Sequence, residues 1–352
     1  MRKSSSRIES PLVSVAKGNT YFVKINRPYA LNSWNLEMIH LLHRLISQAR
    51  EENKNFVFYG QGRAFSAGGD IISISSGKIS SEEIFIGELA AVYYVSLLPT
   101  MRIALMDGIT MGGGSGLAWS CNIRVSTPNT IWAMPETSIG FSPDAGASYH
   151  LSRMNYPELG LYLMLTGDRL NGTDCYLYGF SQYYIEEDIQ KVLQEMQDTE
   201  SFIDVLKKYH VEPDLKQSRI IPVLKELRYC FNIYVGIETI MYRLRELGSK
   251  WSLRALSKIQ ELCPLSLRVA HEAFNRGKHL NYRDCLKMEY NLAVQMTHFR
   301  AENFKEAVKH KLVKKESGRV NWIPNSLEEV GNDAMMPLFE NEEGPKLPLP
   351  RL

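Results

Sequence analysis

The chain has 352 residues, of which 44% are hydrophobic, and its 41 basic and 39 acidic side chains leave a net charge of only +2. This apolar fraction excludes a wholly disordered chain, and the length suits two domains or one large domain with a subdomain. The near-balance of charge argues against a dedicated nucleic-acid binder, and the absence of any run of 18 apolar residues argues against a membrane span.

Residues 1–11 are expected to form a short N-terminal tail, whose start, MRKSSSR, is basic and rich in serine. These are traits of an organelle transit peptide, although the stretch is short and shows no amphipathic pattern. From residue 12 to 187, short β-like runs alternate with helical stretches. The predicted strands are residues 20–25, 55–59, 102–106, 123–126 and 131–134.

Helices are predicted between these strands, at residues 35–51 and 82–97 and after the glycine cluster of residues 111–116. The first of them is amphipathic, because apolar residues recur along it at helical spacing. The order of elements gives a repeated β-β-α rhythm. It predicts an α/β core of parallel strands joined by crossover helices.

The composition changes after residue 187. Leu, Glu, Lys, Arg and Gln dominate there, so residues 188–317 are expected to form a helical C-terminal region. Residues 318–352 are rich in Pro and Asn and carry a short acidic patch at residues 340–343. This last segment is predicted to be a tail that lies extended on the surface.

Two glycine-containing segments form the first candidate site. AFSAGGD, residues 64–70, follows a predicted strand, and MGGGSG, residues 111–116, precedes a predicted helix. Glycine permits close backbone approach and a helix N-terminus offers unpaired N–H groups, so two such loops suit an oxyanion hole. A tight turn and close helix–strand packing are the alternatives. The spacing fits neither a GxGxxG dinucleotide fingerprint nor a P-loop.

Two carboxylates follow these loops. Glu136 lies in AMPET and Asp144 in GFSPDAG, each flanked by Pro or Gly in an apolar stretch. Carboxyl groups in such surroundings tend to have raised pKa values and serve as general acids or bases. For Asp144 the alternative is structural, as the N-cap of the helix that follows; Asp70 is likewise expected to cap a helix after its loop.

The cysteines give information about the compartment. They are odd in number, widely spaced and without a CxxC pair: Cys121, Cys175, Cys230, Cys263 and Cys285. Neither a disulfide framework nor a zinc site is expected, and a reducing compartment is favoured. No metal is predicted.

The motifs AFSAGGD, DGITMGGGSGL and MPETSIGFSPDAGASYHLSR, in this order, resemble those of the enoyl-CoA hydratase/isomerase (crotonase) superfamily. Within it the chain is similar to the 3-hydroxyisobutyryl-CoA hydrolases of valine catabolism. The similarity continues through CPLSLRVAHEAFNRG and LKMEYNLAVQM to about residue 325. It implies a crotonase-like β-β-α core with a helical C-terminal region, and hydrolysis of a short branched 3-hydroxyacyl-CoA thioester.

The resemblance also implies roles for single residues. The backbone N–H groups of Gly69 and Gly113 would form the oxyanion hole. One of the two hydratase glutamates falls on Glu136 but the other falls on Gly116, which argues against hydratase activity. The hydrolase branch pairs Glu136 with Asp144, and both are present. Glu136 would attack the carbonyl or activate water, and Asp144 would hold or protonate the substrate hydroxyl or assist proton transfer.

Further substrate contacts are implied. The carboxylate of Glu88 would make one of them. The backbone near Ala30, Ala67 and Ile71 would make the others, with the adenine and the pantetheine. CoA is part of the substrate, so no separate cofactor is expected. Tyr29 stands where the family often has a basic residue near the CoA phosphates, and this departure is expected to weaken CoA binding.

Two functions of different classes follow from the resemblance. The first is a mitochondrial enzyme with an acyl-CoA as its partner, which is compatible with a homo-oligomer. The alternative is structural, because similar proteins are components of the mitochondrial small ribosomal subunit, with ribosomal RNA and proteins as partners. The basic stretch Lys305–Lys315, expected to be an amphipathic helix, would supply an RNA contact, although a solvated basic face is the simpler interpretation.

Overall fold

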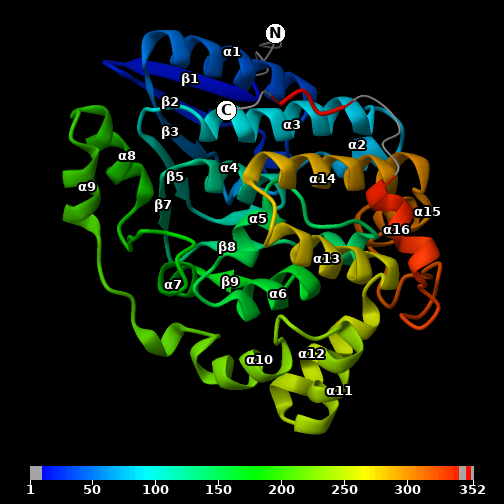
Figure 1. Ribbon diagram of the computed structural model, residues 1–352. Helices are drawn as coiled ribbons and strands as arrows, with labels where there is room; N and C mark the ends of the chain where they lie inside the picture. Colours follow the sequence, from blue (N-terminus) through cyan, green and yellow to red (C-terminus); the bar gives the residue numbers. More distant parts are fainter. Residues whose placement is uncertain (1–9, 341–345, 350–352) are drawn as a thin grey trace, which may run out of the picture.

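Two β-sheets lie at the centre of the computed structural model, which describes residues 10–340 and 346–349 (Figure 1). In this part of the chain the larger sheet has the strand order β1-β2-β3-β5-β7-β10, and its neighbours are parallel except β1 and β2. Its strands are β1 (Leu12–Lys17), β2 (Thr20–Ile25), β3 (Asn55–Gly60), β5 (Arg102–Met106), β7 (Ile123–Ser126) and β10 (Tyr183–Tyr184).

The smaller sheet has the order β4-β6-β8-β9, with only its last pair antiparallel. Its strands are β4 (Ala64–Ser66), β6 (Ile109–Met111), β8 (Ile131–Ala133) and β9 (Leu170–Asn171). The parallel strands expected from the β-β-α rhythm are confirmed in both sheets. Strand β1 was not predicted, because all but one of its residues are at least partly exposed and it lacks an apolar run.

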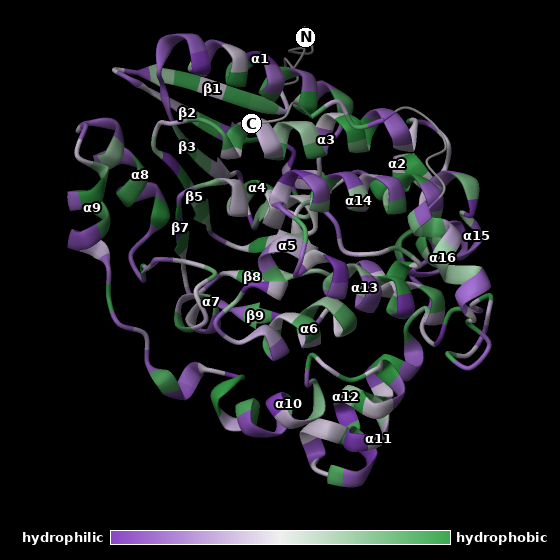
Figure 2. Cartoon of the chain, in the orientation of Figure 1, coloured by the Kyte–Doolittle hydropathy of each residue, from purple (hydrophilic) through white to green (hydrophobic). Residues whose placement is uncertain are grey.

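Both faces of the larger sheet are buried. On one face Phe22 and Val57 contact α8 (Ile189–Gln197) and α9 (Phe202–Tyr209), whose residues alternate between hydrophobic and hydrophilic in Figure 2. On the other face Val23 belongs to the main core, together with buried residues of α1 (Leu36–Glu52), α3 (Ser81–Ser96) and α4 (Gly113–Ser120). Strands buried on both faces carry continuous apolar runs, which is why they were predictable.

The predicted helical C-terminal region is confirmed. The α-helices not yet named are α2 (Ile71–Ser75), α5 (Ala147–Ser152), α6 (Pro157–Thr166), α7 (Gly172–Leu177), α10 (Leu224–Cys230), α11 (Ile237–Leu247), α12 (Lys250–Glu261), α13 (Pro264–Gly277), α14 (Tyr282–Val294), α15 (Glu302–Val308) and α16 (Asn332–Glu340). Helices α13 and α14 run across the core and pack on α5 (Figure 1), while α10, α11 and α12 form a group beyond α6.

The prediction of an extended surface tail at residues 318–352 is wrong over much of the segment that the structure describes. Helix α16 lies within it, and several apolar side chains of the segment are buried, including Trp322 before the helix and Leu338 within it. The indole of Trp322 donates to the Glu261 carbonyl, and Asn291 donates to the Leu338 carbonyl. The segment therefore packs against α12 and α14, because its widely spaced apolar residues meet their apolar faces. Most of the acidic patch lies outside the described residues.

The basic stretch at residues 305–315 begins as α15 and continues as a π-helical turn, Lys309–Val313. Phe304 and Val308 are buried, whereas Lys305, Lys314 and Lys315 are exposed, so the amphipathic character is confirmed. Among the described residues, no helix combines the length and the apolar character needed to cross a bilayer. The predicted N-terminal tail lies outside the described residues except for its last two positions.

Candidate active site

The two glycine loops meet at the N-terminus of α4. Gly69 lies between β4 and α2, and Gly113 is the first residue of α4. A Cβ on Gly68 would stand 3.0 Å from the Gly113 nitrogen, so the loops are in contact. Within the described residues, neither the Gly69 nor the Gly113 N–H donates a hydrogen bond. Two adjacent unpaired donors, one of them at the positive end of a helix dipole, suit a developing oxyanion.

Glu88 lies against both glycines. It comes from α3, and only 5% of its surface is exposed. A Cβ on Gly69 would stand 3.2 Å from one Glu88 oxygen, and a Cβ on Gly113 would collide with the other. Position 113 therefore has to be glycine for the carboxyl to keep this place, whereas a Cβ at position 69 would be a tight contact. Burial raises the pKa of Glu88 to about 7.

Glu136 opens the 3-10 turn Glu136–Ile139, directly after β8. It is buried, and its Oε2 has no hydrogen-bond partner in the described part of the chain. Its Oε1 lies 2.9 Å from the place of a Cβ on Gly112, so it adjoins the same loops. Burial, helped by the negative charges of Glu88 and Glu289, raises the pKa of Glu136 to about 8.

Asp144 lies in the loop between this turn and α5, and 5% of its surface is exposed. Burial raises its pKa, and the charges of Glu88 and Glu136 raise it further. The alternative role as an N-cap is wrong: α5 is preceded by Gly146, and no cap bond comes from the Asp144 carboxyl. The structure thus brings together the predicted carboxylates and glycines.

A fourth carboxyl, Glu289 of α14, was missed by the sequence analysis. It is 1% exposed, and its oxygens accept from the backbone N–H groups of Gly146 and Ser148 and from the Ser148 hydroxyl. Burial raises its pKa to about 7. A signal was present, because Glu289 follows the buried Cys285 and Leu286 at helical spacing, on the apolar stripe of its helix.

Close packing decides what can stand at position 116. A Cβ on Gly116 would lie 2.5 Å from the Cβ of Ala145 and 2.7 Å from its carbonyl oxygen. A glutamate side chain at position 116 would therefore collide with the loop that carries Asp144.

The residues expected along the substrate lie beside the glycine loops. The Ala67 N–H donates to the Leu31 carbonyl at 3.0 Å, next to Ala30, and Ile71 begins α2. These positions are half-buried. The cap predicted for Asp70 is confirmed, because its carboxylate accepts from the Ser73 N–H.

The departure at Tyr29 lies at the surface. Tyr29 is 84% exposed, and the guanidinium of Arg27 lies over its ring. Arg27 is paired with Asp70 at 2.7 Å, in an ion pair that is largely buried. The positive charge of Arg27, two residues before Tyr29, is therefore already neutralised by Asp70.

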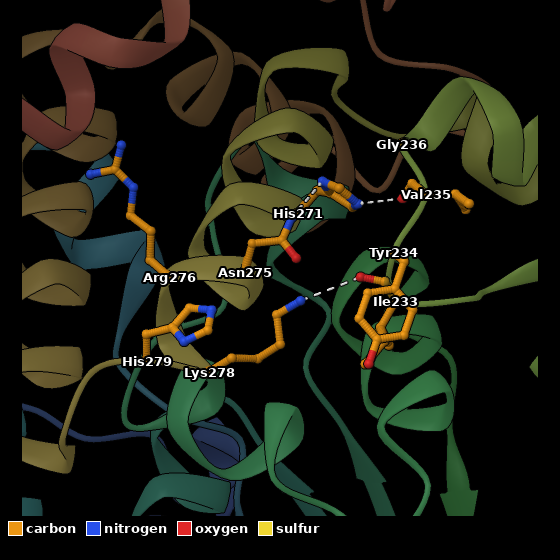
Figure 3. A pocket seen from close by; sticks show the side chains of 9 residues that line it. All are labelled: Ile233, Tyr234, Val235, Gly236, His271, Asn275, Arg276, Lys278 and His279. Carbon is orange, nitrogen blue, oxygen red and sulfur yellow. Dashed lines mark hydrogen bonds between the residues drawn. The ribbon is translucent and has the colours of Figure 1, made fainter.

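A cavity of about 490 Å³ lies elsewhere, between α13 and residues 233–236 (Figure 3). No predicted site residue lines it. Lys278 donates to the Ile233 carbonyl, and the ring of His271 is bonded to the Val235 carbonyl. These contacts hold the turn at residues 233–236 on α13. In the described ranges, no three His, Cys, Asp or Glu side chains are arranged to hold a metal ion.

Comparisons with known proteins identify the family. A family model described as enoyl-CoA hydratase/isomerase matches residues 20–339. The chain is 32% identical to the mitochondrial 3-hydroxyisobutyryl-CoA hydrolase of Xenopus tropicalis, over 88% of this chain and 84% of that protein. It is 31% identical to the Homo sapiens protein of the same name, over 97% and 91%.

A solved structure of a carnitinyl-CoA dehydratase from Mycobacterium thermoresistibile is similar, with a TM-score of 0.87 and 27% identity. The alignment covers 96% of this chain and 98% of that one. An enoyl-CoA hydratase from Rhodobacter sphaeroides gives a TM-score of 0.82 at 25% identity, over 94% and 97%. With its two sheets, its glycine loops and its helical C-terminal region, the chain belongs to the enoyl-CoA hydratase/isomerase (crotonase) family.

Proposed function

We propose that this protein is a mitochondrial hydrolase that cleaves the thioester of 3-hydroxyisobutyryl-CoA to the free acid and CoA. Relatives named for this activity and for the mitochondrion support the proposal at about 30% identity. The observation that carries it is the contact between Gly116 and Ala145. In this proposal position 116 supplies no second glutamate, and the loop that carries Asp144 packs against it.

In this proposal the N–H groups of Gly69 and Gly113 donate to the thioester oxygen as it gains negative charge. Ionised Glu136 attacks the thioester carbon or takes a proton from the attacking water. If Glu136 attacks, the C–S bond breaks as an anhydride with Glu136 forms, and water then hydrolyses the anhydride to the free acid and Glu136. If Glu136 takes a proton from water, the hydroxide adds directly and the C–O bond replaces the C–S bond. In either route the departing thiolate takes up a proton that the water supplies. Asp144 binds or protonates the substrate hydroxyl or carries a proton.

Substrate binding uses the remaining predicted residues. Glu88, whose carboxyl lies against both oxyanion glycines, contacts the acyl part. The adenine and pantetheine follow the backbone near Ala30, Ala67 and Ile71. The exposed Tyr29 offers no charge to the CoA phosphates, so we propose weaker CoA binding than in relatives with a basic residue there.

The test is thioester cleavage by the purified full chain. We expect CoA release from 3-hydroxyisobutyryl-CoA and little hydration of crotonyl-CoA. Glu136→Gln should lower kcat roughly 10²–10⁴-fold, because it removes an acid–base group and leaves the shape unchanged. The measurement is steady-state release of free thiol.

Glu83→Gln is the matched control, since Glu83 is exposed on the same helix as Glu88 and undergoes the same chemical change. It should leave kcat unaltered. Robust hydration of crotonyl-CoA without thioester cleavage would overturn the proposal. A loss below tenfold for Glu136→Gln would show that another carboxyl performs the chemistry.

The relatives described above are named for hydrolysis, and neither name refers to a ribosome. The ribosomal role therefore stays an alternative, to be decided by sedimentation rather than by the site.

A further inference from the structure

The hydrogen bonds of Glu289 tie α14 to the loop that carries Asp144. One oxygen accepts from the Gly146 N–H at 2.7 Å, and the other accepts from the Ser148 N–H at 2.8 Å and the Ser148 hydroxyl at 2.6 Å. All three donors are buried and lie within four residues of Asp144. A carboxylate that accepts several such bonds is held in one orientation, and so are its donors.

These bonds also cap α5. The first N–H groups of a helix have no partner within it, and a carboxylate beside them is favoured by the helix dipole. No side chain of the loop caps α5, and Glu289 supplies the acceptor from another helix. The Asp144 carboxyl is thereby released from the capping role that its sequence position suggests. It faces the charges of Glu88 and Glu136 instead.

The backbone of the loop depends on this clamp. Ala145 has a φ of 53° and Gly146 a φ of 93°, and an L-residue such as Ala145 rarely adopts a positive φ. A Cβ on Gly146 would stand 2.9 Å from the ring of Tyr282, at the start of α14. Tyr282 and Glu289 therefore hold the turn from the same helix. Strained turns persist where their surroundings fix them.

We propose that Glu289 is a positioning residue for thioester hydrolysis: it holds the Asp144–Ser148 turn so that the Asp144 carboxyl keeps its place near Glu136. This inference rests on the proposed function. According to this inference, Glu289 does not contact the substrate and acts by holding Asp144 in place.

The test compares Glu289→Gln with Asn291→Ala in the full chain. Asn291 lies on the same helix but donates to the Leu338 carbonyl, away from the turn. Glu289→Gln should lower kcat roughly 10–100-fold, the usual cost of losing a partner that orients a reacting group, with KM little changed. Asn291→Ala should leave kcat near that of the unaltered protein. Equal losses in the two variants would overturn the inference.

A double-variant cycle separates positioning from general damage. If Glu289 acts through Asp144, adding Glu289→Gln to Asp144→Asn should cost nothing further in kcat. Two losses that multiply in the combined variant would show that Glu289 acts independently of Asp144, and the inference fails.

Amide hydrogen exchange tests the clamp without substrate. The Gly146 and Ser148 amides should exchange faster in Glu289→Gln and at the unaltered rate in Asn291→Ala. Unchanged exchange in Glu289→Gln overturns the inference, even if the unaltered protein cleaves the thioester. If the unaltered protein cleaves no thioester, the proposed function fails, and exchange alone decides whether Glu289 holds the turn.

A milder variant covers the case in which Glu289→Gln does not fold. Ser148→Ala removes one of the three bonds and leaves the two backbone bonds in place. Like Glu289→Gln, Ser148→Ala should lower kcat and speed amide exchange at residues 146–148, but by smaller factors. No change in either quantity would overturn the inference.

Discussion

The buried carboxyl groups hold protons that the unfolded chain would release. The pKa of Glu136 is about 8, and those of Glu88 and Glu289 are about 7, chiefly because burial disfavours the charged form. The groups also repel one another when ionised, so they titrate as an interacting set. At neutral pH the cluster therefore contains both carboxylic acids and carboxylates, which is the mixture that acid–base chemistry needs.

Stability should therefore fall as the pH rises. Between about pH 4.5 and about pH 8 the buried carboxyl groups bind more protons in the folded protein than in the unfolded chain, so they make the free energy of unfolding decrease over this range. The buried His150, whose pKa burial lowers to about 3, acts in the opposite sense below about pH 6.5, but it is one group against four. A tenfold change in one dissociation constant corresponds to about 1.4 kcal/mol. Glu136→Gln should reduce this slope, because the amide does not titrate. Denaturant unfolding at a series of pH values measures it.

Glu83→Gln again provides the comparison. Glu83 lies on α3 and is exposed, so removing its charge should not alter the slope of stability against pH. Stability that rises from pH 5 to pH 8, or a slope that Glu136→Gln leaves intact, would contradict the expectation. In either case the cluster would be more solvated than its burial indicates.

Residues differ in how far sequence reveals them. Glu136 and Asp144 were found because they lie in short segments of Pro, Gly and apolar residues that also carry the family motifs. Glu289 was not found, because its partners precede it by 141 to 143 positions and one carboxylate on an amphipathic helix is usually solvated. Only the fold brings α14 onto the loop before α5.

Among the elements, the strands of the larger sheet were predictable and the C-terminal segment was not. Buried parallel strands are continuous apolar runs between turns, and a single pattern identifies them. Helix α16 has Pro337 inside it and lies in a segment rich in Pro and Asn, so its sequence resembles a surface loop. Its stability comes from packing on α13 and α14, which no local pattern records.

The docking of α16 can be measured. Leu338 is fully buried, so Leu338→Ala should lower the free energy of unfolding by about 2–5 kcal/mol, the cost of a cavity in a packed core. Val313 is 58% exposed, and Val313→Ala should change the free energy of unfolding by about 0.5 kcal/mol or less. Denaturant unfolding of both variants provides the comparison. Equal, small effects would mean that the segment is only loosely attached.

At the scale of the molecule, the remaining choice is between a free enzyme and an assembly component. We expect the protein to stay at the top of a sucrose gradient of mitochondrial extract, at low and at high salt. Any RNA contact of the exposed lysines at residues 305–315 would be electrostatic. Its affinity would fall with salt by about one unit of log–log slope per phosphate neutralised.

Co-sedimentation with the small ribosomal subunit that survives moderate salt would contradict this expectation and favour the ribosomal role. Replacing Lys305, Lys314 and Lys315 by Gln would then show whether the basic stretch makes the contact. Co-sedimentation only at low salt would be non-specific attraction of a basic surface, and the enzyme would stand.

The contact between position 116 and Ala145 constrains how such a chain can change by single steps. A glutamate at position 116 and the present loop at Ala145 cannot occupy the same space, so the loop obstructs a glutamate introduced there alone. The obstruction begins at the first side-chain atom, because even a Cβ at position 116 would lie 2.5 Å from the Cβ of Ala145. A second carboxylate can therefore be introduced at position 116 only together with a change that moves the loop, which a single substitution does not provide.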